Sequence, residues 1–167
     1  MQIRYAGAQD FPSINRIYNQ AIEDGLATAD TSALDVEYHK QWLEGRDMSI
    51  TPVLVAENAA GIAGYVTLSL YRFGRPAVAH VREISYYVQR DARRQGIATA
   101  LLQAAYDACL KIGVTVLLTF VIADNKPSVL FLEKHGFALW GTFPGIVEQN
   151  EARYDHVVLG RHLGSQS

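Results

Sequence analysis

Apolar residues recur at helical spacing in four segments of the chain. Asp10 followed by Pro12 is typical of a residue that caps a helix and of a proline in the first turn. Gly25 and Gly113 suit the position just after a helix, where a left-handed backbone favours glycine. These patterns predict helices from Asp10 to Gly25, from Asp35 to Glu44, from Ala98 to Ile112 and from Asn125 to His135.

Short apolar runs between these helices predict strands. The turn residues from Glu57 to Gly61 separate two such runs and indicate a β-hairpin. Val114 to Ile122 is almost unbroken by polar residues, which is typical of a central strand covered on both faces. Seven strands are expected, at Gln2–Tyr5, Pro52–Ala56, Gly61–Tyr71, Val78–Gln89, Val114–Ile122, Phe137–Thr142 and Tyr154–Leu159.

The resulting element order is β-α-α-β-β-β-α-β-α-β-β, which predicts a mixed α/β (α+β) sheet flanked by helices. A length of 167 residues suits one domain that spans residues 1–167. Hydrophobic residues make up 49% of the chain and charged residues 19%, so the chain can bury a core. This composition excludes general disorder.

Charge and cysteine content narrow the class of partner. Fifteen Lys and Arg against seventeen Asp and Glu argue against nucleic acid or an acidic membrane, which need a basic surface. Cys109 is the single cysteine and cannot form a disulfide within the chain, so nothing calls for an oxidising compartment. The opening MQIRYAGAQD lacks the features of a signal peptide. The five histidines lack metal-ligand spacing. We therefore expect a cytoplasmic protein without a metal.

A strand followed by Arg93-x-x-Gly96-x-Ala98 and then a helix is the most informative local pattern. A helix N-terminus offers unpaired N–H groups and the positive end of the helix dipole, so it can bind an anion. Gly96 and Ala98 let a bulky diphosphate approach the backbone, and Arg94 adds a second positive charge. The alternative is an ordinary basic turn that caps the helix.

Asn125-x-x-Ser128 follows the apolar strand directly and opens the next helix. Both residue types commonly cap helices, and capping alone would account for them. Their position suggests more, because two neighbouring strand–helix units can hold a long ligand between the ends of their strands.

These two units resemble the acetyl-CoA-binding half of the GNAT superfamily of acyl-CoA-dependent N-acetyltransferases. Its acyl-CoA loop pattern, Arg/Gln-x-x-Gly-x-Gly/Ala, is met in the run QRDARRQGIATALL. Its later Asn and its Gly-Phe pair are met in IADNKPSVLFLEKHGF. Over nearly its whole length the chain is also similar to the phosphinothricin/methionine-sulfoximine N-acetyltransferase branch, through IRYAGAQDFPSINRIYNQAI, VLVAE, GYVTLS and an E-x-S-x-Y-V run that starts at Glu83.

The resemblance implies a mixed sheet splayed into a V, with acetyl-CoA bound in the opening. In the superfamily the diphosphate lies on the loop and the pantetheine arm pairs with the preceding strand, while the later Asn lies beside the pantetheine. The residues at the corresponding positions are Arg93, Arg94, Gln95, Gly96, Ile97, Ala98 and Thr99 for the loop, Tyr86, Tyr87 and Val88 for the strand, and Asn125 and Ser128 for the later helix.

Glu83 is the candidate general base. It lies in the apolar and aromatic run HVREISYYV, where a carboxylate is costly unless it is paired or functional. An amine with a reference pKa of about 10 must lose a proton before it attacks a thioester. The alternative is a structural ion pair with Arg82 or another cation. Ser85 shares the strand face of Glu83 and is expected to contact the acceptor.

After attack, a backbone N–H of the strand from Tyr86 to Val88 is the expected donor to the oxyanion. Relatives then carry a Tyr or His acid four residues before the Gly of Gly-Phe, and Leu132 stands there in this chain. Either His135 or Tyr87 replaces that acid, or the CoA thiol, with a pKa near 8.5, leaves without one. We favour the last possibility.

Arg72 and Arg75, in the loop before the Glu83 strand, are the candidates for binding an anionic group of the acceptor. The alternative for each is a solvated surface arginine. The branch places an aromatic residue and a threonine where this chain has Val78 and Val81, which makes phosphinothricin itself a doubtful acceptor.

The leading hypothesis is therefore an acetyl-CoA-dependent N-acetyltransferase acting on the amine of a small amino-acid-like acceptor. A peptide or protein acetyltransferase and a non-catalytic acyl-CoA-binding module are the alternatives. The branch commonly forms dimers, so a homodimer is expected.

Overall fold

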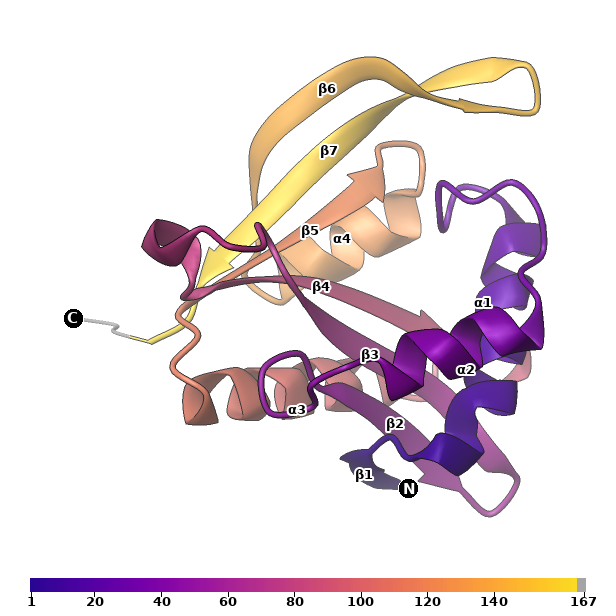
Figure 1. Cartoon of the computed structure of the whole chain (residues 1–167). Coiled ribbons are helices and arrows are strands. Elements are labelled where there is room, and N and C mark those ends of the chain that lie inside the picture. Colours follow the sequence, from indigo (N-terminus) through magenta and orange to yellow (C-terminus); the bar gives the residue numbers. More distant parts are fainter. Residues whose placement is uncertain (165–167) are drawn as a thin grey trace.

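A computed structural model describes residues 1–164 of the chain as one seven-stranded sheet with helices on both faces (Figure 1). The strand order is β1-β2-β3-β4-β5-β7-β6. The strands are β1 (Gln2–Tyr5), β2 (Val53–Asn58), β3 (Gly61–Leu70), β4 (Val81–Val88), β5 (Val116–Ile122), β6 (Ala138–Gln149) and β7 (Ala152–His162). The helices are α1 (Phe11–Asp24), α2 (Val36–Glu44), α3 (Ile97–Lys111) and α4 (Lys126–Lys134). The predicted order of elements and the mixed sheet are confirmed.

The sheet is splayed between β4 and β5. These two strands are parallel and share three residue pairs, from Val81 with Val116 to Glu83 with Leu118. Beyond Glu83, β4 continues to pair with β3 as far as Val88, while β5 pairs with β7 as far as Ile122. The edge of β4 that faces β5 therefore lacks a strand partner over its second half, and the V predicted from the family resemblance is present.

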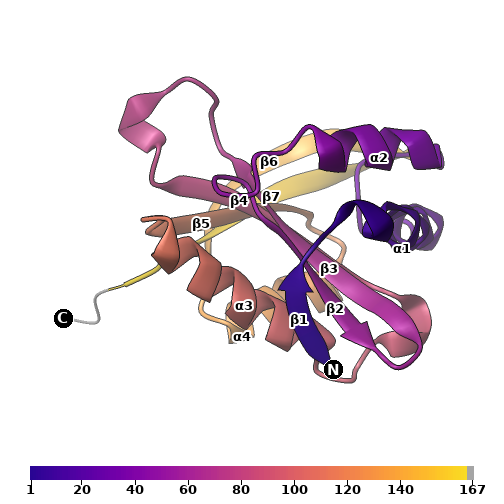
Figure 2. The same ribbon diagram turned by 60° about the horizontal axis from the view of Figure 1, so that its bottom comes forward.

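Helices cover the two faces of the sheet in pairs. Figure 2 shows α3 and α4 on one side of the sheet and α1 and α2 on the other. The larger core cluster lies under α3 and α4, and a second cluster joins Ile14 and Ile17 of α1 to Val53, Val55 and Tyr65 of β2 and β3. Each cluster uses one face of the alternating strand pattern, as expected for a sheet between two layers.

Helix α3 is held by an apolar stripe at helical spacing. Leu101, Leu102, Ala105 and Cys109 are each fully buried against the sheet. Burial also raises the pKa of the Cys109 thiol to about 12, so Cys109 is a core residue and not a reactive thiolate. The stripe fixes the position of the first turn of α3, which the sequence pattern identifies as an anion site.

The start of α1 differs in detail from the prediction. Asp10 precedes the helix, but its carboxylate does not cap the first turn. It accepts a hydrogen bond from Gly7 N at 2.8 Å and a two-point ion pair from Arg4. Two charge-assisted hydrogen bonds from a guanidinium stabilise a buried carboxylate more than a helix N-terminus does, so the Asp10 side chain points to Arg4.

Three strand boundaries also differ from the sequence prediction. β4 begins at Val81 and not at Val78, because Pro76–Val78 forms a short 3₁₀ turn. β6 extends well beyond Thr142, since its pairing tolerates Pro144 and Gly145 as an irregularity between Phe143 and Val147. β7 extends beyond Leu159 to His162 because it pairs there with β5. Proline in an edge strand costs no ladder hydrogen bond on its solvent side.

The α3 stripe predicts a large difference between two leucines of the same helix. Leu101 is fully buried, whereas Leu110 is 58% exposed. Leu101→Ala should lower the free energy of unfolding by about 2–5 kcal/mol, since it leaves a cavity in the core. Leu110→Ala should change it by about 0.5 kcal/mol or less. Urea unfolding followed by circular dichroism measures both, and equal effects would contradict this packing of α3.

Candidate active site

Two cavities open where β4 parts from β5. The smaller has a volume of about 280 Å³ and the larger about 560 Å³. They share five lining residues and so meet in one place, which we call the junction. The residues of the junction are Ala27, Tyr86, Tyr87, Asn125 and Ser128.

The larger cavity is lined by the residues that the sequence predicted for acetyl-CoA, with one exception. Gln95 lines neither cavity, because its side chain turns back to donate to Asp91 O at 3.2 Å. The predicted residues that line the larger cavity are Tyr86, Tyr87, Val88, Arg93, Arg94, Gly96, Ile97, Ala98, Thr99, Asn125 and Ser128.

The first turn of α3 forms one wall of the larger cavity. Gly96 precedes it with a φ of 78°, a left-handed conformation that favours glycine. No heavy atom lies within 4 Å of where a Cβ of Gly96 would be, so the backbone here faces open space. The first N–H groups of a helix have no partner within the helix, and the dipole adds positive charge. An anion fits this wall.

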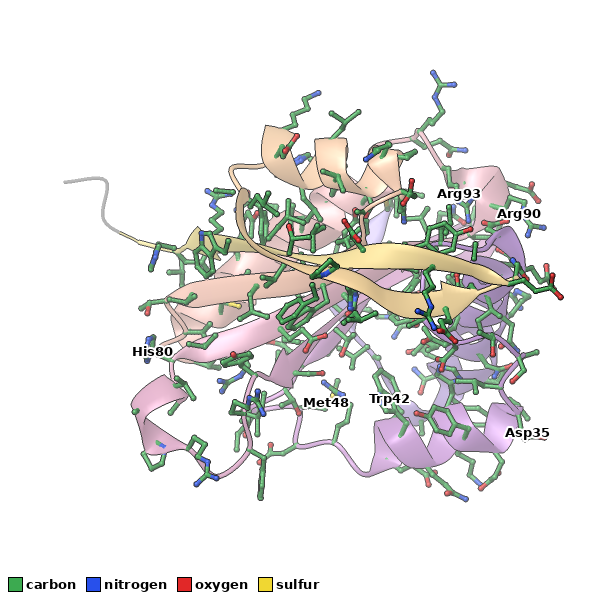
Figure 3. All side chains as sticks on the ribbon, turned by 90° about the horizontal axis from the view of Figure 1, so that it is seen from above. Asp35, Trp42, Met48, His80, Arg90 and Arg93 are labelled. Atoms are coloured by element: carbon green, nitrogen blue, oxygen red, sulfur yellow. The ribbon has the colours of Figure 1, made fainter. Side chains whose placement is uncertain are left out.

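Two arginines beside this wall are oriented by α1. Arg93 forms an ion pair with Asp24 at the end of α1, and Arg90 pairs with the same carboxylate at 2.7 Å. Figure 3 shows Arg90 and Arg93 side by side at one end of the molecule. Burial alone would raise the pKa of the Asp24 carboxyl, but the hydrogen bonds and charges of Arg93 and Arg90 hold that pKa below its ordinary value.

The smaller cavity lies on the other side of the junction. Glu83 and Ser85 of β4 line one side of it, and Phe120 of β5 and His156 of β7 line the other. The segment after α1 contributes Ala27, Thr28 and Ala29.

Glu83 is half-buried and carries an uncompensated carboxylate. No hydrogen bond or ion pair within residues 1–164 involves its side chain. The proposed structural pair with Arg82 is absent, because Arg82 donates to the carbonyl oxygens of Ile50, Ala79 and Val81. Burial raises the pKa of Glu83, which makes this carboxylate a stronger base than one in water.

Tyr18 and Tyr87 form a polar aromatic cluster in the lining of the smaller cavity. Their rings pack edge to face at 5.0 Å, and the Tyr18 hydroxyl contacts Thr28 Oγ1 at 2.8 Å and donates to Asp30. Burial raises the pKa of Tyr87 far above its ordinary value, so its phenol stays neutral.

Gln149, at the tip of the β6–β7 hairpin, donates to Thr28 O at 2.7 Å. Figure 1 shows this hairpin reaching toward the segment that follows α1.

The position of the relatives' acid and the two alternative donors lie in different places. Leu132, a residue of α4, is fully buried in the larger core cluster and lines neither cavity. His135 also lies outside both cavities, where its ring contacts Phe131 O at 2.7 Å and Thr99 Oγ1 at 3.4 Å. Tyr87 lines both cavities.

Arg72 and Arg75 line neither cavity. Both are exposed in the segment between β3 and β4, where the Arg72 guanidinium lies over the Tyr71 ring at 5.6 Å from its centre. Figure 3 shows His80, at the end of this segment, at the opposite end of the molecule from Arg90 and Arg93. The contact of Arg72 and Arg75 with an acceptor stays a prediction.

Sequence reasoning missed most of the smaller cavity. Its Phe120 and His156 come from strands whose apolar runs read as packing, and Thr28 lies in a segment without periodicity. Asp24 carried a signal that could have been used, since it is an acidic residue in the last turn of a helix, where a carboxylate is unfavourable without a cation.

Within residues 1–164, no group of three or more His, Cys, Asp or Glu is arranged to hold a metal ion. No helix in the described part of the chain has the length and apolar character needed to cross a membrane.

Comparison with known proteins gives a consistent result. Residues 14–137 match the model of the acetyltransferase (GNAT) family. The chain is 38% identical to YwnH of Bacillus subtilis, provisionally named a phosphinothricin acetyltransferase, over 98% of this chain and 99% of that protein. It is 31% identical to an L-methionine sulfoximine/L-methionine sulfone acetyltransferase of Pseudomonas paraeruginosa, over 86% of this chain and 84% of that protein.

A solved structure agrees with these relatives. The GNAT-superfamily phosphinothricin acetyltransferase of Sinorhizobium meliloti, in complex with acetyl-CoA, superposes with a TM-score of 0.90 at 26% identity. The match covers 98% of this chain and 88% of that one.

The unpaired Glu83 carboxylate should reduce the stability of the fold. Because its folded-state pKa is raised, ionisation costs free energy in the folded state once the pH exceeds the ordinary glutamate pKa of about 4.3. Glu83→Gln should therefore raise the free energy of unfolding at pH 7, and the gain should vanish below pH ~4. Urea unfolding across this pH range tests it, with the exposed Glu133→Gln as the control. A loss of stability at pH 7 would show that Glu83 has a stabilising partner.

Proposed function

Since this chain belongs to the acetyltransferase (GNAT) family, we propose that it transfers the acetyl group of acetyl-CoA to the primary amine of a small amino-acid-like acceptor. Glu83 acts as the general base. One observation carries the proposal: a cavity with an anion-binding helix N-terminus meets a cavity with an unpaired carboxylate, along a strand edge that lacks a partner.

Acetyl-CoA occupies the larger cavity. Its diphosphate lies on the first turn of α3, where Arg93 and Arg94 neutralise its charge. Its pantetheine arm follows β4 from Tyr86 to Val88, where the edge toward β5 has no strand partner. This course brings the thioester to the junction. A backbone N–H of the same strand edge then donates to the oxyanion of the tetrahedral intermediate.

The acceptor amine enters from the smaller cavity. An alkylammonium with a pKa near 10 is mostly protonated at neutral pH, so it must lose a proton before it attacks the thioester carbon. Glu83 accepts that proton, directly or through a water. A general base works best when its pKa lies near the working pH, and the raised pKa of Glu83 lies closer to neutral pH than that of an ordinary glutamate. Ser85, on the same face of β4, contacts the acceptor.

An amino-acid-like acceptor is supported by the size of the smaller cavity and by the relatives. A volume of about 280 Å³ suits a small molecule better than a peptide chain. The relatives are named for acetylation of phosphinothricin, methionine sulfoximine and methionine sulfone, all amino-acid analogues. Arg72 and Arg75 as acceptor-binding residues, a homodimer and a cytoplasmic location remain predictions.

Loss of the base should slow the chemistry. Glu83→Gln should lower kcat by about 10²-fold or more at neutral pH, because the neutral amide accepts no proton from the amine. Thiol release from acetyl-CoA, measured across a panel of free amino acids and short peptides, gives the rate and the acceptor class together. Glu133→Gln is the matched control. An unchanged kcat in Glu83→Gln would remove Glu83 from the mechanism, and faster turnover of peptides would overturn the small acceptor.

Loss of a diphosphate contact should weaken cofactor binding. Arg93→Ala should raise KM for acetyl-CoA about tenfold, the effect of one charge-assisted hydrogen bond, while KM for the amine changes much less. Lys111→Ala, at the other end of α3, is the control. Initial rates with each substrate varied in turn measure both constants. Equal rises in the two KM values would contradict this placement of the diphosphate.

A further inference from the structure

The junction offers few groups that can stabilise a leaving thiolate. Four of its five residues have polar side chains, namely Tyr86, Tyr87, Asn125 and Ser128. The proposed function places the thioester here, so a group that contacts the departing sulfur must come from this set. The acid expected from the family pattern is replaced by the fully buried Leu132.

Two of the four are engaged elsewhere. Tyr87 packs its ring against Tyr18 and Tyr65, on the face of the sheet under α1 and away from the face to which Tyr86 points. Asn125 caps α4, where its Oδ1 accepts from Ser128 N at 3.3 Å. Its remaining amide N–H groups suit a carbonyl oxygen of the pantetheine arm.

Tyr86 and Ser128 form a hydroxyl pair. Their oxygens lie 2.8 Å apart, so one hydroxyl donates to the other and the second keeps a proton free for a further acceptor. A phenol is the more acidic of the two groups, which favours donation from Tyr86 to Ser128. The Tyr86 ring is held in place by Phe131 of α4, with ring centres 5.1 Å apart. Burial raises the pKa of Tyr86 to about 12, so the phenol keeps its proton at neutral pH.

We propose that the Ser128 hydroxyl, oriented by Tyr86, donates a hydrogen bond to the coenzyme A sulfur as the C–S bond breaks. The amine nitrogen forms a bond to the acetyl carbon, and the C–S electron pair moves onto sulfur. The nitrogen gives up its second proton to Glu83, which has by then released the first one to solvent. The thiolate leaves with its charge stabilised by the hydroxyl, and no proton need be transferred to it at that moment. This assignment rests on the proposed function.

Ser128→Ala should therefore lower kcat by about 10- to 100-fold, the range for a hydrogen bond to a charged group, with a much smaller change in KM for acetyl-CoA. Ser128→Thr keeps the hydroxyl and should restore most of the rate. Tyr86→Phe, which removes only the positioning contact, should cost less than Ser128→Ala.

The leaving group provides a readout that a structural role would not change. The acetyl selenoester of coenzyme A releases a selenolate, which is a weaker base than a thiolate and needs less stabilisation. The deficit of Ser128→Ala, relative to the native protein, should shrink markedly with this substrate. An equal deficit with both esters would overturn the proposed contact with sulfur.

The chain offers a matched control for each substitution. Ser13 is the third residue of α1 and follows Pro12, just as Ser128 is the third residue of α4 and follows Pro127, but Ser13 lines neither cavity. The Tyr106 hydroxyl lies outside both cavities, where it accepts from Arg161 Nη1 at 3.0 Å and donates to His135 O at 3.4 Å. Ser13→Ala and Tyr106→Phe should leave kcat unchanged.

Turnover by the native protein distinguishes a failure of the proposed function from a failure of the Ser128 assignment. If it fails to release thiol from acetyl-CoA with any amine of the panel, the proposed function falls and this inference with it. If the native protein turns over and Ser128→Ala matches Ser13→Ala in kcat, the hydroxyl assignment alone is overturned.

Discussion

The short parallel pairing of β4 with β5 is the contact on which the site depends. The two strands share three residue pairs, end that pairing at Glu83 and Leu118, and then part. A longer ladder would have satisfied the backbone of β4 on both edges and left no space for a ligand. Each strand remains bound to its other neighbour, β3 or β7, so a rigid sheet holds the gap open. Both cavities lie along this gap.

Charge is arranged differently at the two ends of the gap. At the α3 end, the Asp24 carboxylate pairs with both Arg90 and Arg93 and orients them. At the other end, the Glu83 carboxylate has no partner within residues 1–164, and its desolvation is a cost in stability. Functional groups are often kept in such unfavourable surroundings, because the same desolvation that destabilises the fold increases basicity.

Local rules were sufficient for the order of the elements, and the family resemblance was sufficient for most of the lining of the larger cavity. Hydrophobic spacing and turn residues predicted the order of the four α-helices and seven strands, but not the short 3₁₀ turns such as Pro76–Val78. Local rules failed where a contact between distant segments decided the outcome. Asp10 turned to Arg4 instead of capping α1, and Gln95 turned away from the cavity toward Asp91 O. The smaller cavity joins Thr28, Phe120 and His156, which are far apart in the chain and carry no shared motif.

The sequence by itself determined which segments fold as helices or strands and which loop can bind an anion, because both follow from spacing within a few residues. Only the tertiary structure decided that Glu83 has no counter-ion, that Arg82 donates to backbone carbonyls instead, and that Tyr86 meets Ser128 where the two cavities join. The contacts that decide these outcomes join residues far apart in the chain, since Arg82 and Ile50 are 32 positions apart and Tyr86 and Ser128 are 42 apart, so no local pattern contains them.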